Sequence, residues 1–403
     1  MRKVIVTKTK DSLIAAEEEN GRISGLFLEN SELVSLVGRI YVGRVSHIMK
    51  NIEAAFVEIG QGTICYFPLE DWRKYPSSGM EGRQLHEGDE LLIQVEKDAV
   101  KTKAPVATTF LTFTGQYLVL RVGKTGIFFS SRLKDINRKE SLKEFLSKNA
   151  EASFPFSFIV RTNAASASDE AIFAELQFLL SEAAHILSVW KTRTANTLLY
   201  EPEPAFLTEI FNNRIESLDE VVTDDPAAYR LIEEKKSVFM EQNEGYSLPV
   251  LRFYKDEYPL FKLYSLETVL ARALSEKVWL KSGGFLVIQP TEALVSIDVN
   301  TGKFDGRKKL EDTFFKINLE AAKEIALQLK LRNLSGIIII DFIDMAEELH
   351  RQKLLETLSE ALEKDPVKTT VYGFTKLNLV EMTRKKIRTP LHELLSKTEW
   401  KYT

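Results

Sequence analysis

The clearest pattern of hydrophobic and polar positions lies in residues 291–345. Residues 293–300 alternate between apolar and polar side chains, which is the period of a strand with one buried face. Residues 311–333 then repeat apolar positions every three to four residues, as an amphipathic helix does. Residues 336–340 are a continuous apolar run, typical of a strand covered on both faces. The pattern therefore predicts a βαβ unit whose two strands are parallel.

Both predicted strands end in acidic residues. Asp298 lies near the end of the first strand, with Asn300 two residues later, and Asp341 follows the second strand. Because the carboxyl ends of parallel strands meet at one edge of a sheet, we expect Asp298 and Asp341 to lie close together. Two carboxylates at such an edge suit a hard divalent cation such as Mg²⁺. Asp344 comes an odd number of residues after Asp341, so we expect it to face the other side and to be structural.

Two basic stretches flank these strand ends. Residues 303–309 follow the first strand, and residues 383–388 lie near the end of the chain. The formal net charge of −4 argues against a protein that coats nucleic acid indiscriminately, so any contact with nucleic acid would have to come from such local stretches. Acidic strand ends also cap helices, and charge runs also form solvated faces. The pattern alone leaves a metal–phosphate site and a structural role both open.

A resemblance to a known family is carried by two segments, VSIDVNTGKFDG and NLEAAKEIALQLKLRNLSGIIIIDFIDM. They resemble the catalytic core of the ribonuclease E/G family, endoribonucleases that cut single-stranded RNA. The resemblance implies that Asp298 and Asp341 hold Mg²⁺, that Asn300 contacts the scissile phosphate, and that the product carries a 5′ phosphate. In the segment YGFTKLNLVEMTR, Lys376 stands where the family more often has an arginine, and it is expected to contact RNA.

The first 36 residues read as a strand and a hairpin that turns at Asn20–Gly21. This is too little for a domain, so we expect a later part of the chain to complete its sheet. Residues 201–270 contain strand-like segments that can do so. The resemblance implies that residues 1–36 and 201–270 form a ribonuclease-H-like scaffold, and that residues 271–403 form a DNase-I-like α/β catalytic subdomain.

Residues 37–112 contain short alternating strands separated by glycine-containing turns, which predicts a small β-barrel. The segments GRVSHI, AAFVEIG and CYFPL resemble the OB-fold RNA-binding module named after ribosomal protein S-one. By that resemblance Phe56 and Tyr66 stack on bases and Lys103 is a basic contact. Alternation cannot decide whether the two aromatic side chains are exposed in this way or are part of the core.

Residues 113–200 combine two strand-like segments with an amphipathic helix over residues 171–192. The segment FIVRT resembles the family's pocket for an RNA 5′ monophosphate. Arg161 would then bind the phosphate through its guanidinium, Thr162 would donate its hydroxyl, and Arg132 would be a further basic contact. The loop after Thr162 lacks the family's usual glycine. The alternative is that Arg161 makes a structural ion pair.

The composition limits the number of domains, the cellular location and the kinds of metal site that the chain can have. The 403 residues could hold two to four domains, and 44% hydrophobic residues suffice for buried cores. With no signal peptide pattern and no run of about 18 apolar residues, we expect a cytoplasmic protein without a membrane segment. Cys65 is the only cysteine. The CPxC element by which the family joins protomers through zinc is therefore missing, so we expect no structural zinc and no zinc-linked oligomer.

The patterns predict an α+β chain of several subdomains. The resemblance implies that these are a ribonuclease-H-like scaffold with an inserted OB-fold barrel and 5′-sensor, followed by a DNase-I-like catalytic subdomain. The predicted function is that of a Mg²⁺-dependent endoribonuclease acting on single-stranded RNA, with a possible preference for 5′-monophosphate ends. One alternative is a non-catalytic RNA-binding protein of the same fold. Another is a hydrolase of a different phosphodiester.

Overall fold

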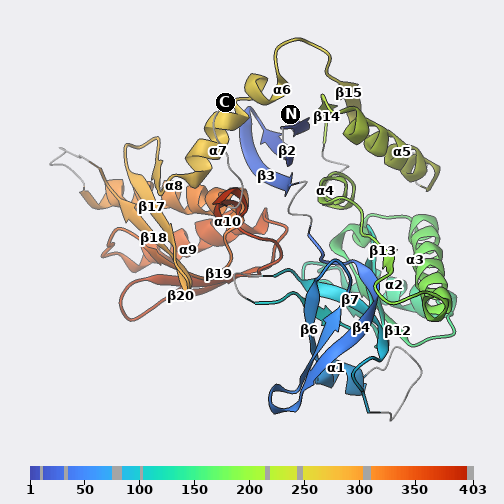
Figure 1. Cartoon of the computed structure of the whole chain (residues 1–403). Helices are drawn as coiled ribbons and strands as arrows, with labels where there is room; N and C mark the ends of the chain where they lie inside the picture. Colours follow the sequence, from blue (N-terminus) through green and yellow to red (C-terminus); the bar gives the residue numbers. More distant parts are fainter. Residues whose placement is uncertain are drawn as a thin grey trace. The chain divides into compact units, whose positions relative to one another are not determined.

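The computed structural model describes residues 1–9, 12–30, 35–74, 84–99, 103–213, 218–242, 248–302 and 310–396 (Figure 1). The chain divides into two compact units, which consist of residues 1–31, 218–229 and 249–403, and of residues 32–217 and 230–248. The basic run predicted over residues 303–309 lies outside the described residues.

The first unit contains a sheet with the strand order β15-β14-β1-β2-β3. Its strands are β1 (Arg2–Lys8), β2 (Ser12–Glu19), β3 (Arg22–Asn30), β14 (Glu220–Thr223) and β15 (Val250–Phe253). The predicted turn is present, with Asn20 and Gly21 at φ 52° and 79°. β14 and β15 join β1 in parallel, which confirms that a later part of the chain completes the hairpin's sheet.

Three short helices pack on this sheet around a shared apolar core. They are α6 (Leu260–Leu263), α7 (Leu266–Leu274) and α10 (Leu391–Ser396). Lys3 pairs with Glu220 at 2.7 Å, and Arg252 pairs with the same carboxylate at 2.6 Å, so charged side chains link β1, β14 and β15 across the sheet.

The second sheet of this unit lies in the segment predicted to be the catalytic subdomain, and we therefore call it the catalytic sheet. Its strand order is β16-β17-β18-β19-β21-β20. Its strands are β16 (Lys277–Trp279), β17 (Phe285–Pro290), β18 (Leu294–Asn300), β19 (Gly336–Asp341), β20 (Thr369–Phe374) and β21 (Val380–Arg384). The helices α8 (Leu310–Leu331) and α9 (Glu348–Glu363) share one apolar core with one face of this sheet. β18, α8 and parallel β19 confirm the predicted βαβ unit.

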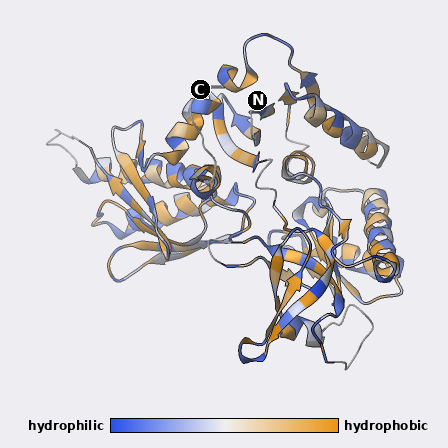
Figure 2. Cartoon of the chain, in the orientation of Figure 1, coloured by the Kyte–Doolittle hydropathy of each residue, from blue (hydrophilic) through white to orange (hydrophobic). Residues whose placement is uncertain are grey.

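The second unit contains a closed OB-like barrel. Its five strands are β4 (Ile40–Met49), β5 (Ala54–Glu58), β6 (Ile64–Pro68), β7 (Glu90–Lys97) and β8 (Val106–Thr108). Pairing of β4 with β7 closes the barrel, and β13 (Leu198–Tyr200) adds to β4 from outside it. Both hydrophobic and hydrophilic residues occur along the barrel strands (Figure 2), although apolar runs such as residues 54–57 of β5 break the strict alternation that predicted the barrel.

A four-stranded sheet follows the barrel in the second unit, with the order β11-β12-β10-β9. Its strands are β9 (Thr112–Thr114), β10 (Leu118–Val122), β11 (Gly126–Phe129) and β12 (Phe156–Val160). The helices α2 (Ile136–Asn149) and α3 (Asp169–Val189) pack on it. Of the described helices, α3 alone has the length and composition of a membrane span, but its apolar stripe packs in the core of this unit.

The remaining elements are short helices and two further α-helices. They are η1 (Lys50–Ile52), α1 (Leu69–Lys74), η2 (Thr162–Ala165), η3 (Trp190–Thr192), α4 (Ala205–Asn213) and α5 (Pro226–Gln242). The architecture is thus mixed α/β with an OB-like barrel. The ribonuclease-H-like and DNase-I-like assignments, and the subdomain boundaries, stay predictions.

Candidate functional site

The register of the catalytic sheet brings the predicted acidic residues together. β18 and β19 pair in parallel with Asp298 opposite Asp341, so the two residues are direct cross-strand neighbours. Asn300 donates from Nδ2 to Asp298 Oδ2 at 2.7 Å. Both aspartates are exposed. The residues of β18 that alternate with Asp298, namely Val295, Ile297 and Val299, are buried on the helix-covered face. The expectation that Asp298 and Asp341 lie close together is confirmed. We call Asp298, Asn300 and Asp341 the acidic strand ends.

Negative charge accumulates at the acidic strand ends. Partial burial raises the pKa of Asp341 above its ordinary value, and the charges of Asp298 and Asp344 raise it further. The charge of Asp344 thus acts on Asp341, whereas the direction of its side chain stays a prediction. The reason is that β19 ends at Asp341, so alternation no longer fixes the direction of residues beyond it.

The loop that follows Asp341 is held by side chains of α8. The buried Asn318 donates from Nδ2 to the Ile343 carbonyl at 2.8 Å and accepts from the Ile343 N–H at 3.1 Å. Glu311 Oε1 accepts from the backbone N–H groups of Ala346 and Glu347, each at 3.0 Å. These contacts join residues 25 to 36 positions apart, so no local pattern in the sequence indicates them.

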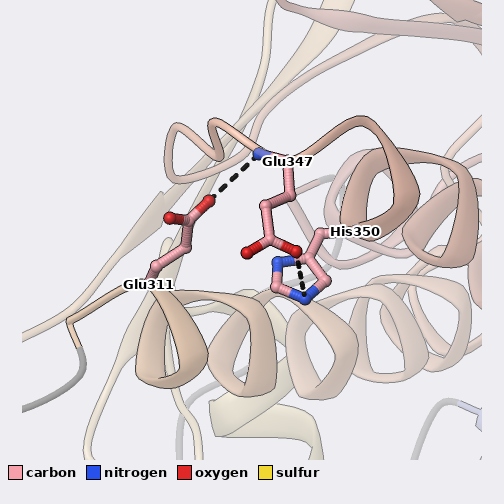
Figure 3. A group of neighbouring side chains, drawn as sticks. All are labelled: Glu311, Glu347 and His350. Atoms are coloured by element: carbon pink, nitrogen blue, oxygen red, sulfur yellow. Dashed lines mark hydrogen bonds and ion pairs between the residues drawn. The ribbon is translucent and has the colours of Figure 1, made fainter.

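Glu311 also belongs to a carboxylate–histidine group with Glu347 and His350 (Figure 3). Their potential ligand atoms lie within 4.8 Å of one another, and His350 Nε2 lies 3.4 Å from Glu347 Oε2. The imidazole stacks on Phe315 with ring centroids 4.0 Å apart. These donors are of the kind that hold divalent cations, and the sequence analysis did not identify them. Together they fix the first turn of α9 against α8.

The hairpin that carries Lys376 lies beyond the same edge of the catalytic sheet. β21 begins at Val380, which pairs with Ile340 of β19. The turn between β20 and β21 therefore lies beside Asp341, at the end of β19. Lys376 is exposed in this turn. Arg384, in the basic stretch 383–388, is buried and pairs with Asp365 at 2.7 Å. This arginine is therefore structural, so any RNA contact of the stretch would have to come from its other basic residues.

The barrel places its two aromatic residues on adjacent strands. Phe56 and Tyr66 are register partners of β5 and β6, with ring centroids 6.2 Å apart in an edge-to-face arrangement. Both side chains are half-buried, whereas their neighbours Ala55, Val57 and Phe67 are fully buried in the barrel core. Alternation left this question open, and the structure puts both rings on the outer face. Lys103 is exposed.

The predicted phosphate contacts meet at the ends of two parallel strands. β11 and β12 pair in parallel, and Phe129 lies opposite Val160. The residues that follow these strands are linked by hydrogen bonds. The hydroxyl groups of Ser130 and Thr162 lie 3.1 Å apart, and the backbone N–H of Arg132 donates to Ser130 Oγ at 3.3 Å. We call Ser130, Arg132, Arg161 and Thr162 the basic strand ends. Arg132 and Thr162 are exposed and Arg161 is half-buried.

Arg161 is held by groups that the sequence did not indicate. Its Nη1 donates to the Gly115 carbonyl at 2.5 Å. Burial raises the pKa of Glu175, while hydrogen bonds from the N–H groups of Leu118, Tyr117 and Gln116, and the charge of Arg161, act in the opposite direction. Glu175 thus ties the turn between β9 and β10 to α3 and lies within electrostatic range of Arg161.

Comparison with known proteins gives consistent matches. A profile described as the Ribonuclease E/G family matches residues 112–387, which include both the acidic and the basic strand ends. Ribonuclease G of Escherichia coli (strain K12) is 35% identical, over 97% of this chain and 81% of the relative. Ribonuclease G of Haemophilus influenzae is 33% identical over the same shares, 97% and 81%. Ribonuclease E of Escherichia coli (strain K12) is 30% identical over 98% of this chain and 38% of the relative.

Proposed function

The chain belongs to the ribonuclease E/G family and is an endoribonuclease, and from this premise we propose that it cleaves single-stranded RNA with Mg²⁺ held at Asp298 and Asp341. We further propose that it favours RNA with a 5′ monophosphate and acts in RNA processing or decay in the cytoplasm. The observation that carries the proposal is the direct cross-strand pairing of Asp298 with Asp341.

The acidic strand ends fit a hard divalent cation. Their donors are carboxylate oxygens, which Mg²⁺ prefers, and membership in this ribonuclease family suggests the use of a divalent metal. Partial burial raises the pKa of Asp341 and repulsion by Asp298 raises it further, and a divalent cation held by the two carboxylates would offset that repulsion. When bound, Mg²⁺ would polarise the phosphate and lower the pKa of a water ligand. Asn300 keeps Asp298 oriented through its 2.7 Å hydrogen bond and can turn its amide toward the scissile phosphate.

The second unit supplies further candidate contacts to the RNA. Phe56 and Tyr66 offer ring surface on the outer face of the barrel, where stacking is tolerant of base identity. Lys103 and Lys376 are exposed and can pair with backbone phosphates. The basic strand ends combine hydroxyl and guanidinium donors, which suit a terminal phosphate monoester.

One assay tests the proposed activity. A 5′-labelled single-stranded RNA is incubated with the protein and Mg²⁺, with the protein and EDTA, and, in parallel, as a duplex with Mg²⁺. We expect internal cleavage only of the single strand with Mg²⁺, and products that carry 5′ phosphates. Stable binding of the RNA without cleavage under any divalent cation would instead support the non-catalytic RNA-binding alternative.

A further inference from the structure

The exposed face of the catalytic sheet continues from the acidic strand ends to an aromatic pair. Trp279 of β16 lies opposite Phe285 of β17, and Phe285 lies opposite Asn300 of β18. In the neighbouring row, Lys277 lies opposite Val287, which lies opposite Asp298. Cross-strand neighbours project from the same face of a sheet. Trp279 is therefore two strand spacings, about 10 Å, from Asn300 on the same face.

The opposite face of these strands is occupied, which fixes the direction of the aromatic pair. Leu286 and Val299 are buried in the core shared with α8 and α9, and Val278 packs against it. Phe285 and Trp279 alternate with these residues and so face outward. Trp279 is 64% exposed, which is a large apolar surface to leave in water beside a charged site.

A lysine lies against both rings. Lys277 Nζ is 4.2 Å from the ring centroid of Trp279 and 3.6 Å from that of Phe285. The two rings lie 5.3 Å apart with an interplanar angle of 57°. Two aromatic surfaces and an ammonium group form the combination that binds a nucleotide, because the base stacks and the neighbouring phosphate pairs with the cation. We call Lys277, Trp279 and Phe285 the aromatic platform.

The turn between β16 and β17 is anchored, so the aromatic platform is preorganised. Glu320 of α8 accepts the N–H groups of Lys281 at 2.6 Å and Ser282 at 3.1 Å. Gly284 approaches the backbone of Asn300 so closely that a Cβ would lie 2.7 Å from the Asn300 carbonyl oxygen. Binding to such a fixed surface requires little ordering of the protein, which favours affinity.

We propose that the aromatic platform binds one nucleobase of the RNA strand, within one or two nucleotides of the cleaved bond, by stacking on Trp279. This inference rests on the proposed function, because it takes the scissile phosphate to lie at the acidic strand ends. The platform adds a base contact on the catalytic sheet itself, separate from the barrel. It stacks any base and therefore positions the strand more than it selects a sequence.

The test uses short single-stranded RNAs in which one base at a time, on either side of the cleavage site, is replaced by an abasic ribose. In the wild type we expect one position at which base removal lowers kcat/KM by about 5- to 150-fold. Trp279→Ala should show a comparable loss on intact RNA and no further loss from the abasic change at that position, as expected for two halves of one contact. Trp279→Phe should restore most of the activity.

Tyr372→Ala is the matched control, because Tyr372 is also 64% exposed and lies on β20, the opposite edge strand of the same sheet. It should leave the abasic dependence at the Trp279 position unchanged. Thermal unfolding of each variant confirms that the fold is retained. If Trp279→Ala responds to every abasic position as the wild type does, the platform is wrong while the nuclease assignment stands.

Failure of the proposed function gives a different result. If the wild type binds these RNAs but cleaves none with Mg²⁺, the nuclease proposal fails. The same RNA series is then measured by fluorescence anisotropy. Loss of base dependence at one position in Trp279→Ala, but not in Tyr372→Ala, would still support the platform, and unchanged dependence would overturn it.

Discussion

The acidic and the basic strand ends are built in the same way and carry opposite charge. Each lies where two neighbouring parallel strands end, β18 with β19 and β11 with β12. In the acidic pair, partial burial raises the pKa of Asp341, and repulsion by the nearby charges raises it further. In the basic pair, Arg161 already donates to the Gly115 carbonyl and lies within range of Glu175. The same backbone geometry thus gives one site whose charges repel and one site whose charge is partly compensated.

The largest effect should come from removing one charge of the acidic pair. We expect Asp298→Asn or Asp341→Asn to lower cleavage at least about 100-fold, roughly 2.7 kcal/mol of transition-state stabilisation, because one carboxylate alone holds the cation poorly. RNA binding, measured by anisotropy in EDTA, should be nearly unchanged.

The control for this prediction is Glu381→Gln. Glu381 is exposed on β21 of the same sheet and pairs in register with Ile339. The substitution removes the same charge from a position outside the acidic strand ends and should leave cleavage within about twofold. Near-normal turnover in either aspartate variant would show that the acidic pair is structural. This is the same alternative that the sequence analysis gives for Arg161 in the basic pair.

The second prediction asks whether the basic strand ends bind a terminal phosphate. If they do, the wild type should cleave 5′-monophosphate RNA faster than the same RNA with a 5′-hydroxyl, by roughly 10- to 100-fold, the value of one charged hydrogen bond. Arg161→Ala should abolish this preference and change the rate on 5′-hydroxyl RNA little. Lys148→Ala, which removes an exposed charge at the end of α2, should keep the preference.

Equal wild-type cleavage rates on 5′-monophosphate, 5′-triphosphate and 5′-hydroxyl RNA would show that the basic strand ends do not bind a terminal phosphate. The contact with Gly115 and the nearby Glu175 would then be the whole role of Arg161. Arg161→Ala would in that case lower thermal stability without any dependence on the RNA end.

The sequence predicted the features that depend on local period. Alternation over residues 293–300 and the apolar run at 336–340 determined the βαβ unit and hence the pairing of Asp298 with Asp341. The turn at Asn20–Gly21 was equally local. Alternation gives no guidance beyond the end of a strand: β19 ends at Asp341, so the direction predicted for Asp344 stays a prediction, although its charge contributes to the raised pKa of Asp341.

Contacts between distant segments were beyond the reach of sequence patterns. Asn318 and Glu311 hold the loop after Asp341 from another helix, and Glu175 reaches backbone groups 57 to 59 residues away. Arg384 was counted with a basic stretch, although its guanidinium is buried on Asp365. Charge runs do not distinguish a buried arginine from an exposed one, because that difference depends on a tertiary partner.

The third prediction concerns Phe56 and Tyr66, whose proposed RNA contacts involve no charge and can be compared with those of the acidic and basic strand ends. Phe56→Ala or Tyr66→Ala should weaken binding of single-stranded RNA by at least about 1 kcal/mol, roughly fivefold, because each ring offers stacking surface on the outer face of the barrel. The loss should be independent of the 5′ end. Phe178→Ala, which removes an exposed ring from α3, is the control and should bind RNA normally. Unfolding of Phe56→Ala or Tyr66→Ala would mean that the ring serves the barrel's packing instead.

The smallest effect should come from Asp344, and its sign should depend on the metal. In the folded metal-free chain the pKa of Asp341 lies above its ordinary value of 3.8, so the native state binds this proton more tightly than the unfolded chain does. The stability that this gives is complete below pH 3.8 and is lost as the pH rises through the raised value. Removing the Asp344 charge lowers that value.

Because Asp341 and Asp344 are both exposed, solvent screens their repulsion. In EDTA at pH 7, Asp344→Asn should therefore be only slightly more stable than the wild type, by under about 0.5 kcal/mol, and the difference should shrink as the pH falls toward 4. Saturating Mg²⁺ should reverse the order, because the nearby carboxylate of Asp344 then attracts the bound cation and the wild type gains more in Tm. Differential scanning calorimetry with EDTA and with Mg²⁺ measures both differences. An identical Tm increase on adding Mg²⁺ in the two proteins would show that Asp344 does not act on the cation. Its charge would then affect only the protonation of Asp341.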